Sequence, residues 1–284
     1  MLAGIVTSAT ATSLDAADGV ITTARRHAPD LPIWVLTAEG VPGADGLPET
    51  EGGAVANPAA VTVAPVGDVI GDVGVAVTET LGHDDQVAFA LPFLLERLTA
   101  EVGPILYVSP GCLLTDRPTE IAELLVDHPL ALAARSTPSY THSTTPHLVE
   151  MTLGRGQLSH RVFGIRSGTE AMLDDWKSTM VESFFDVMQR RPTDFVGSVF
   201  AAAAGRPLAT IGGERTLMNW TDYAAVESGR AVGRRPALVV ADELWTLGRR
   251  QAEADGDAEV EWQLLADKVH DSRPLGALVE VVTS

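Results

Sequence analysis

The chain has 284 residues, enough for one large α/β domain or two smaller ones, and 45% of them are hydrophobic, so it can bury a large core. Asp and Glu number 38 against 20 Lys and Arg, which gives a formal net charge of -18 at pH 7. A negative charge of this size repels polyanions, so it argues against a nucleic-acid partner and against an anionic membrane surface.

Cysteine content and hydropathy indicate the cellular compartment. A single cysteine, Cys112, rules out an intramolecular disulfide and a CxxC metal motif, and we expect a buried, reduced thiol. The N-terminal stretch "MLAGIVTSATATSLD" has no basic residues before its short apolar run, unlike a secretion signal. No uninterrupted apolar stretch reaches the roughly 18 residues of a membrane helix. We therefore expect a cytoplasmic protein without membrane insertion.

The first part of the chain predicts a strand, a helix and a second strand. The runs "LAGIVTS" (2–8) and "PIWVLTA" (32–38) are short and rich in β-branched residues. Between them, apolar residues recur at helical spacing, and Ser13 is placed to cap the helix. A β-α-β unit implies a parallel sheet with a right-handed crossover. Residues 39–60, dense in Gly, Pro and acids, predict a surface loop.

The middle of the chain continues the alternation. Residues 61–77 have apolar residues without a clear period, whereas residues 84–101 have the pattern of an amphipathic helix, with Pro92 near its start or at a kink. "PILYVS" (104–109) reads as a strand buried on both faces, and it ends in an uncharged loop that begins with Ser109. A helix follows over 117–128, with Thr119 as its cap.

The remaining elements are predicted in the same way. Their ranges are a strand over 129–135, a polar loop over 136–160, a strand over 160–166, helices over 168–191 and 193–205, short strands over 207–211, 215–220 and 236–242, and a helix over 257–270. Such alternation of strands and helices predicts one mainly parallel sheet with helices on both faces.

Three groups of side chains are candidates for chemistry, and each has a simpler interpretation. His142, His147 and His160 would need a helix to hold them at ligand spacing, so a solvated loop explains them better than a metal site. The arginines of "GRAVGRR" (229–235) would suit phosphate groups, or they decorate an edge turn. Asp194 opens the helix predicted over 193–205, whose dipole would keep its pKa low, or it simply caps or decorates that helix.

The order of several segments resembles the nucleotide-sugar glycosyltransferases of the GT-A fold. "GIVTSATATSLDAADGVITTARRHAPDLPIWVLTAEG" is similar to the opening of that family, where a helix ends in an "R-H-x-P-D" turn before the second strand. "FALPFLLERLTAEVGPILYVSPGCLLTDRPTEIAELL" is similar to its central block, in which a strand leads into an Asp-x-Asp loop.

Three later segments extend the resemblance in the same order. They are "SHRVFGIRSGTEAMLDDWKSTM", "TDFVGSVFAAAAG" and "RTLMNWTDYA". The resemblance covers about residues 3–250 and implies a single GT-A-like α/β domain over 1–250. The remaining residues, 251–284, are expected to form a C-terminal helical extension.

The resemblance also assigns site residues. Ser8, Ala9 and Thr10 would lie where a nucleotide base and ribose rest. Asp194 would stand where the family has an acidic residue close to the reacting sugar, and Asn219 on the strand near the acceptor.

Several charged positions of the family are replaced in this sequence. The two metal-binding aspartates correspond to Ser109 and Gly111, and a hydroxyl with a bare backbone is a poor substitute for two carboxylates around Mg²⁺ or Mn²⁺. A Lys or Arg common in the family is Leu91 here. The family's histidine in the last strand is also replaced, although Asp242 or Glu243 could supply an oxygen. We therefore expect no divalent metal cofactor.

Three interpretations remain open. One is a metal-independent glycosyltransferase that holds the diphosphate of a nucleotide sugar with Arg234 or Arg235. Another is a catalytically inactive GT-A-like domain that binds a ligand or assembles with itself or a partner enzyme. The third is an unrelated α/β binding protein with the same order of elements.

Overall fold

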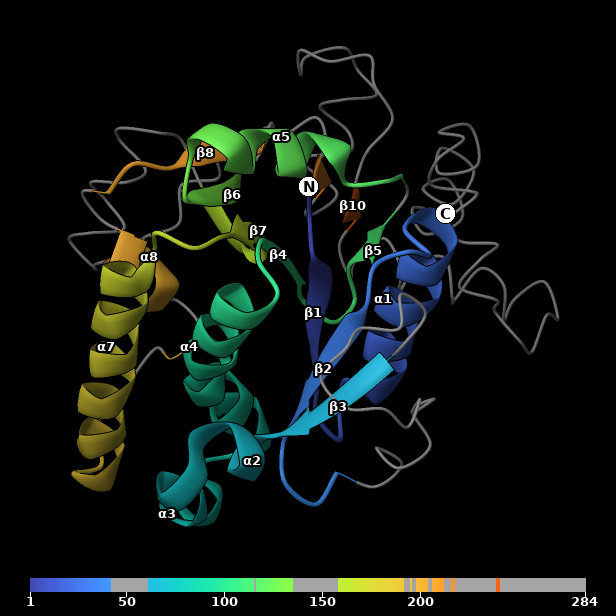
Figure 1. Ribbon diagram of the computed structural model, residues 1–284. Helices are drawn as coiled ribbons and strands as arrows, with labels where there is room; N and C mark the ends of the chain where they lie inside the picture. Colours follow the sequence, from blue (N-terminus) through green and yellow to red (C-terminus); the bar gives the residue numbers. More distant parts are fainter. Residues whose placement is uncertain are drawn as a thin grey trace, which may run out of the picture.

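A computed structural model describes residues 1–41, 61–114, 116–134, 158–191, 195, 198–203, 206–211, 216–217 and 239–240. Its centre is a seven-stranded sheet (Figure 1). In spatial order the strands are β3 (Val61–Pro65), β2 (Ile33–Thr37), β1 (Gly4–Ala9), β4 (Ile105–Val108), β7 (Leu158–Ile165), β6 (Leu130–Ala134) and β8 (Ala209–Ile211).

The sheet is mixed but mostly parallel. β1 pairs in parallel with β2 and β4, β2 with β3, and β6 with β8. β7 runs antiparallel to both of its neighbours, β4 and β6. All strands except β7 therefore point the same way, which confirms the mainly parallel α/β sheet predicted from the alternation of elements.

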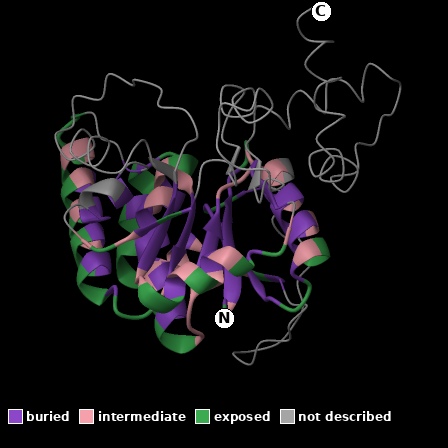
Figure 2. Ribbon diagram, turned by 90° about the horizontal axis from the view of Figure 1, so that it is seen from above, coloured by how far each residue is buried: buried purple, intermediate pink, exposed green. Residues whose placement is uncertain are grey.

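Helices cover both faces of this sheet, as Figure 2 shows in the view from above. One face carries α1 (Leu14–His27) and α5 (Thr119–Asp127). The other face carries α2 (Val66–Ile70), α3 (Gly74–Thr80), α4 (His83–Glu101), α7 (Glu170–Met188) and α8 (Ser198–Ala203), with a 3₁₀ turn, η2 (Gly71–Val73), before α3.

Strand alternation explains why each face has a core of its own. Successive side chains of a strand point to opposite faces, so Ile5 packs toward α1 and its neighbour Val6 toward α4. In β4, Leu106 and Tyr107 divide in the same way. Every residue of β1 and β4 is buried, which fits their apolar sequences.

Two predicted helix caps differ from the structure. Ser13 occupies the N-cap position of α1, but its Oγ accepts a hydrogen bond from the Thr10 N–H at 2.9 Å and makes no bond to the helix. Thr119 is the first residue of α5, and Pro118 stands at the cap. Both hydroxyls have competing partners nearby, which local sequence does not reveal.

The predicted strands after residue 214 pair outside the main sheet. β9 (Thr216–Leu217) and β10 (Val239–Val240) join β5 (Leu113–Leu114) in a separate three-stranded sheet. β10 is antiparallel to β5 and parallel to β9. Segments more than 120 residues apart in sequence therefore meet directly beyond the loop that follows β4.

The described residues test several other predicted elements, and some predictions lie outside them. α4 continues through Pro92, and residues 61–77, where the sequence had no clear period, lie in β3 and in three short helical segments, the last of which ends at Thr80. The strand predicted over 160–166 is confirmed as β7, which begins at Leu158 and includes His160. Most of the loops predicted over 39–60 and 136–160, the helix over 257–270 and the boundary at residue 250 fall outside the described residues. Among the described helices, none combines the length and hydropathy of a membrane span.

Candidate functional site

The topology of the sheet marks one place for a ligand. From β1 the chain proceeds outward to β2 and β3 on one side, and β4 lies on the other side of β1. In open α/β sheets, ligands bind outside the carboxyl ends of the strands where the order reverses in this way. The crevice beyond β1 and β4 is therefore the expected site.

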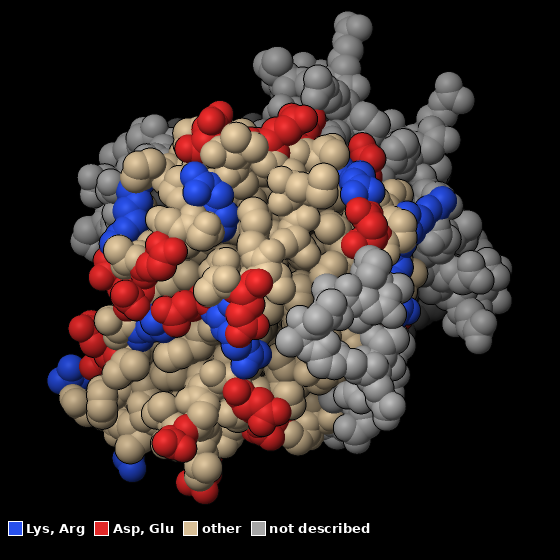
Figure 3. Space-filling view, viewed as in Figure 1, with Lys and Arg blue, Asp and Glu red and all other residues tan. Residues whose placement is uncertain are grey.

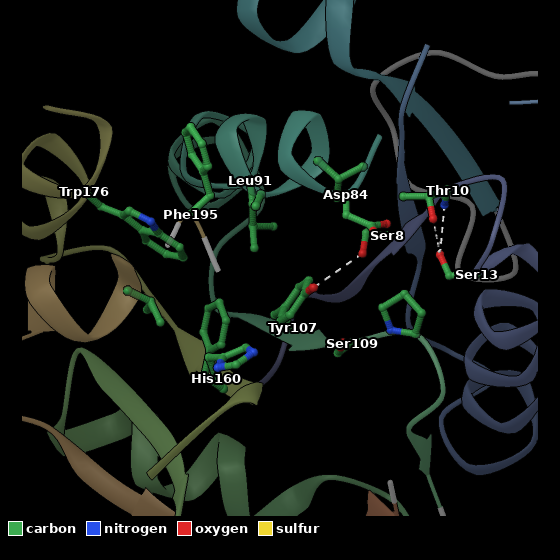
Figure 4. A pocket seen from close by; sticks show the side chains of 15 residues that line it. Ser8, Thr10, Ser13, Asp84, Leu91, Tyr107, Ser109, His160, Trp176 and Phe195 are labelled. Atoms are coloured by element: carbon green, nitrogen blue, oxygen red, sulfur yellow. Dashed lines mark hydrogen bonds between the residues drawn. The ribbon is translucent and has the colours of Figure 1, made fainter. Parts of the chain in front are cut away.

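A cavity of about 230 Å³ opens at this point (Figure 4). It is lined from the carboxyl ends of β1 and β4, from β7, and from α4, α7 and α8. The lining residues are Ser8, Thr10, Ser13, Asp84, Val87, Ala88, Leu91, Tyr107, Ser109, Pro110, His160, Phe163, Trp176, Phe195 and Val199.

One end of the cavity is rich in hydroxyl groups. Ser8 Oγ lies 3.4 Å from the Tyr107 hydroxyl, a long hydrogen bond that crosses from β1 to β4. Thr10 Oγ1 lies 2.9 Å from Ser13 Oγ and 3.1 Å from Thr12 Oγ1. Hydroxyls both donate and accept hydrogen bonds, so this end suits a ligand with uncharged polar groups.

Backbone hydrogen bonds fix the loop after β4, which lines the cavity. The Ser109 N–H donates to Arg161 O at 2.7 Å, and Ser109 O accepts from the Cys112 N–H at 3.1 Å. Gly111 has a φ of 77°, in the left-handed region, and its N–H donates to Ala16 O at 3.3 Å. Glycine adopts this conformation without the steric cost of a Cβ. Cys112 is fully buried, as predicted.

Tyr107 has a perturbed phenol. Its burial raises the pKa of the hydroxyl above the ordinary value, because the phenolate would lose its hydration. Hydrogen bonds from the Ser8 and Ser109 side chains and the charge of Arg161 act in the opposite direction, and the nearby Cys112 adds to the increase. Tyr107 is therefore a neutral hydrogen-bond donor at pH 7.

The other end of the cavity is aromatic. The rings of Tyr107 and Phe163 have centroids 4.9 Å apart, and those of Phe163 and Trp176 lie 6.0 Å apart. Phe195, just before α8, completes this wall. Trp176 lies within the helix predicted over 168–191, and its place beside the loops after β1 and β4 was not predicted, because that contact joins positions far apart in the chain.

Charge is sparse around the cavity. Among the described residues that line it, the ionisable side chains are Asp84, Tyr107 and His160, with the exposed Asp84 in the first turn of α4. On the face drawn in Figure 3, the described Lys and Arg side chains are interspersed with Asp and Glu. Within the described ranges, no group of three or more His, Cys, Asp or Glu is placed to hold a metal ion.

The predicted site residues have different places. Ser8, Thr10 and Ser109 all line the cavity, whereas Ala9 and Gly111 are buried beside it. Leu91 also lines it. The other predicted site residues lie outside the described part of the chain, and they are Asp194, Asn219, Arg234 and Arg235. Asp84 was not predicted as a site residue, although it begins the amphipathic helix predicted over 84–101.

Comparison with known proteins identifies the fold. No protein-family model matches the chain, and no curated protein matches it in sequence. Among solved structures, an active-site variant of LgtC superposes with a TM-score of 0.54 at 17% identity, covering 91% of this chain and 97% of that chain. The galactosyltransferase LgtC with donor and acceptor sugar analogues gives 0.52 at 16% identity, covering 93% and 95%.

A third solved structure is similar in fold and also distant in sequence. The apo form of the glycosyltransferase GlyE of Streptococcus pneumoniae TIGR4 gives a TM-score of 0.53 at 12% identity, covering 94% of this chain and 63% of that chain. At such identities the likeness establishes architecture. The chain has a GT-A-like fold, with a mixed, mostly parallel seven-stranded sheet between helices.

Proposed function

We propose that the protein is a glycosyltransferase-like protein that binds a nucleotide sugar at the β1/β4 cavity and transfers the sugar without a divalent metal. The observation that carries this proposal is a hydroxyl-lined cavity at the switch point of a GT-A-like sheet. LgtC, which has the same fold, was solved with donor and acceptor sugar analogues. Ser8 and Thr10 would hydrogen-bond the uncharged part of the nucleotide.

The residues after β4 do not fit a metal ion. By resemblance to the glycosyltransferases, Ser109 and Gly111 stand where two aspartates would bind it. Mg²⁺ and Mn²⁺ prefer carboxylate oxygens. The Ser109 hydroxyl is neutral and Gly111 has no side-chain oxygen, so the two residues offer neither a negative charge nor a second side-chain ligand. Asp84 is the one carboxylate among the described lining residues, so it has no acidic partner there.

Transfer without a metal requires other charges. The bond between the anomeric carbon and the diphosphate breaks, a bond to the acceptor oxygen forms, and the leaving diphosphate takes the electron pair. Arg234 and Arg235 are our candidates to stabilise that negative charge, since guanidinium groups bind phosphate oxygens in pairs. Asp194 is the candidate to accept the proton of the acceptor hydroxyl, and Asn219 to contact the acceptor.

A second candidate function is a catalytically inactive domain that binds a ligand or assembles with a second copy or a partner enzyme. One observation favours it. Leu91 and Ser109, two positions where the resemblance implies charged side chains, line the same cavity. A site that has lost charge at both positions is expected to bind an uncharged ligand more readily than to catalyse the departure of a diphosphate.

Calorimetric titration with a panel of nucleoside diphosphates and their sugars separates these functions. We expect binding that is unchanged by EDTA or by added Mn²⁺, and release of nucleoside diphosphate when an acceptor is present. Binding that EDTA abolishes would contradict metal independence. Binding without release supports the inactive domain, and no binding to any member of the panel removes the proposed transferase.

A designed variant supplies the positive control for the metal. Ser109→Asp combined with Gly111→Asp places two carboxylates on the loop after β4. Asp is among the residues that tolerate the left-handed backbone at position 111. We expect this variant to bind Mn²⁺ measurably tighter than the unmodified chain, while Ser178→Asp, on the exposed side of α7, does not.

A further inference from the structure

The apolar end of the cavity is lined by buried apolar side chains. Five apolar side chains from four elements and the segment before α8 form it, and none is more than 6% exposed. They are Leu91, Phe163, Trp176, Phe195 and Val199. A void surrounded by such side chains gives a water molecule few hydrogen-bond partners, so filling it with an apolar group is favourable.

The single polar atom of the Trp176 side chain is already bonded. Its Nε1–H donates to Ser198 Oγ at 2.7 Å, and the Ser198 hydroxyl donates to Phe195 O at 2.6 Å. The indole therefore offers only carbon atoms to a ligand. The Phe163 ring, 6.0 Å from Trp176 between ring centroids, extends the same carbon surface toward β4.

Tyr107 marks the boundary between the two ends. Its ring packs on Phe163 at 4.9 Å between centroids, whereas its hydroxyl lies 3.4 Å from Ser8 Oγ among the hydroxyl groups. Figure 4 shows this hydroxyl directed toward Ser8, with Trp176 and Leu91 on the other side. A ligand that fits the whole cavity therefore needs an apolar group next to uncharged polar groups.

The size of the cavity selects the apolar group. An apolar cavity of about 150 Å³ is enough to bind benzene in another protein. The present cavity, about 230 Å³, has room for one six-membered aromatic ring and for polar atoms at the hydroxyl end. Aromatic rings also pair favourably with aromatic walls in offset or edge-to-face arrangements.

We propose that the apolar end of the cavity is a binding site for an uncharged aromatic ring, and that hydroxyl groups attached to this ring's substituent lie against Tyr107 and Ser109. The site would thus accept an aryl-bearing sugar or alcohol. That this molecule is the acceptor of a sugar rests on the proposed function, whereas the binding of the ring does not.

Two matched ligands test the proposal on the unmodified full-length chain. Phenyl β-D-glucopyranoside and methyl β-D-glucopyranoside share the sugar and differ in the ring. We expect the phenyl glucoside to bind at least about tenfold tighter by calorimetry, because burial of the ring removes apolar surface from water. Equal affinities, or no binding of either glucoside, would overturn the proposal without any need for a variant.

A pair of variants locates the ring. Ala88 lies in α4, lines the cavity and is half-buried, so Ala88→Phe would place a ring of the protein's own in the cavity. Ala100, at the other end of α4, is exposed, and Ala100→Phe is the matched control. We expect Ala88→Phe to abolish the preference for the phenyl glucoside and Ala100→Phe to retain it. A folded Ala88→Phe variant that keeps the preference would contradict the assignment to this cavity.

The outcomes separate this inference from the proposed function. If the phenyl glucoside binds and no nucleoside diphosphate sugar does, the ring site stands and the transferase proposal fails. If nucleotide sugars bind and the two glucosides do not differ, the reverse holds. If both bind, addition of the phenyl glucoside to the chain with its nucleotide sugar should yield a glycosylated aryl product that mass spectrometry can detect.

Discussion

At the scale of single residues, Tyr107 joins the two chemistries of the cavity. Its ring belongs to the apolar core on the α4 face, and its hydroxyl reaches the β1 side. Neighbouring hydroxyls that stabilise the phenolate do not offset the desolvation, so burial dominates the pKa. The side chain is thus a neutral donor beside Ser109, one of the positions where the resemblance implies a carboxylate.

The raised pKa of Tyr107 has a consequence for alkaline stability. In the folded state its pKa lies above the ordinary value of 10.0, so the unfolded chain releases this proton first as pH rises. The stabilisation of the folded state by the neutral Tyr107 hydroxyl is complete below about pH 10, and it is lost as the pH rises through the folded-state pKa. We expect Tyr107→Phe to make the fall in unfolding free energy above about pH 10 less steep, measured by urea denaturation at several pH values.

The unfolding free energy of the same variant at pH 7 is the control for that prediction. At pH 7 the Tyr107→Phe variant loses the hydrogen bonds of the Tyr107 hydroxyl with the Ser8 and Ser109 side chains, so its unfolding free energy should fall by about 1–2 kcal/mol. Identical slopes for variant and unmodified chain above pH 10 would show that Tyr107 ionises equally in both states.

Gly111 allows a second prediction at this scale. Its φ of 77° places an L side chain in the left-handed region, and the turn is fixed by the hydrogen bond from Gly111 N–H to Ala16 O. We expect Gly111→Ala to lower the free energy of unfolding by about 1–2 kcal/mol. Gly111→Asn should lose less, since Asn tolerates this conformation. Equal losses for Ala and Asn in thermal unfolding would argue against backbone strain as the cause.

At the scale of elements, the site depends on where α7 and α8 lie. Trp176 of α7 reaches the cavity, and its indole N–H is held by Ser198 at the start of α8. The same Ser198 hydroxyl binds Phe195 O, so one side chain fixes two parts of the aromatic wall. Lys177, next in α7, ties this helix to α4 through Glu96 at 2.7 Å.

Removal of the Ser198 hydroxyl should therefore loosen the wall. Ser198→Ala leaves the buried Trp176 N–H without its acceptor, and an unsatisfied buried donor costs about 1–3 kcal/mol. We expect that loss in chemical denaturation, together with a shifted tryptophan emission. Ser178→Ala, on the exposed side of α7, is the control and should change stability by less than about 0.5 kcal/mol. A neutral Ser198→Ala would mean that water or another group replaces the hydroxyl.

Local patterns predicted these elements better than their pairing. Hydrophobic periodicity located α1, α4, α5 and α7 and the strands β1, β2 and β4 near their observed positions. A short stretch of sequence is enough for this, because its pattern of apolar residues shows whether one face or both faces of the element are buried. The reversed direction of β7 and the separate sheet of β5, β9 and β10 were not predicted, since pairing depends on contacts between distant segments.

The candidate site shows the same limit. Ser8, Thr10 and Ser109 were predicted from the resemblance to the GT-A glycosyltransferases, and they line one cavity. The aromatic wall was not predicted, since Phe163 and Trp176 have the local pattern of ordinary core residues. A buried aromatic residue becomes part of a site only through its neighbours in space, and a single sequence without structure does not give them.

At the scale of the whole molecule, the central sheet separates two cores. Ile21 of α1 lies in the core on one face, and Ile105 of β4 faces the other. Both are almost completely buried, and they belong to different clusters. Because the same strands form one wall of each core, loss of either core removes support from the other, and the two should unfold in a single cooperative step.

Conservative truncations on the two faces test this arrangement. Ile21→Val and Ile105→Val each remove one buried methylene, which typically costs about 0.5–1.5 kcal/mol. The two sites share no core cluster, so we expect the double variant to equal the sum of the single variants within about 0.5 kcal/mol in urea denaturation. Circular dichroism and tryptophan fluorescence should follow the same transition. A variant on one face that splits the transition into two would show that the cores unfold separately and that the sheet does not couple them.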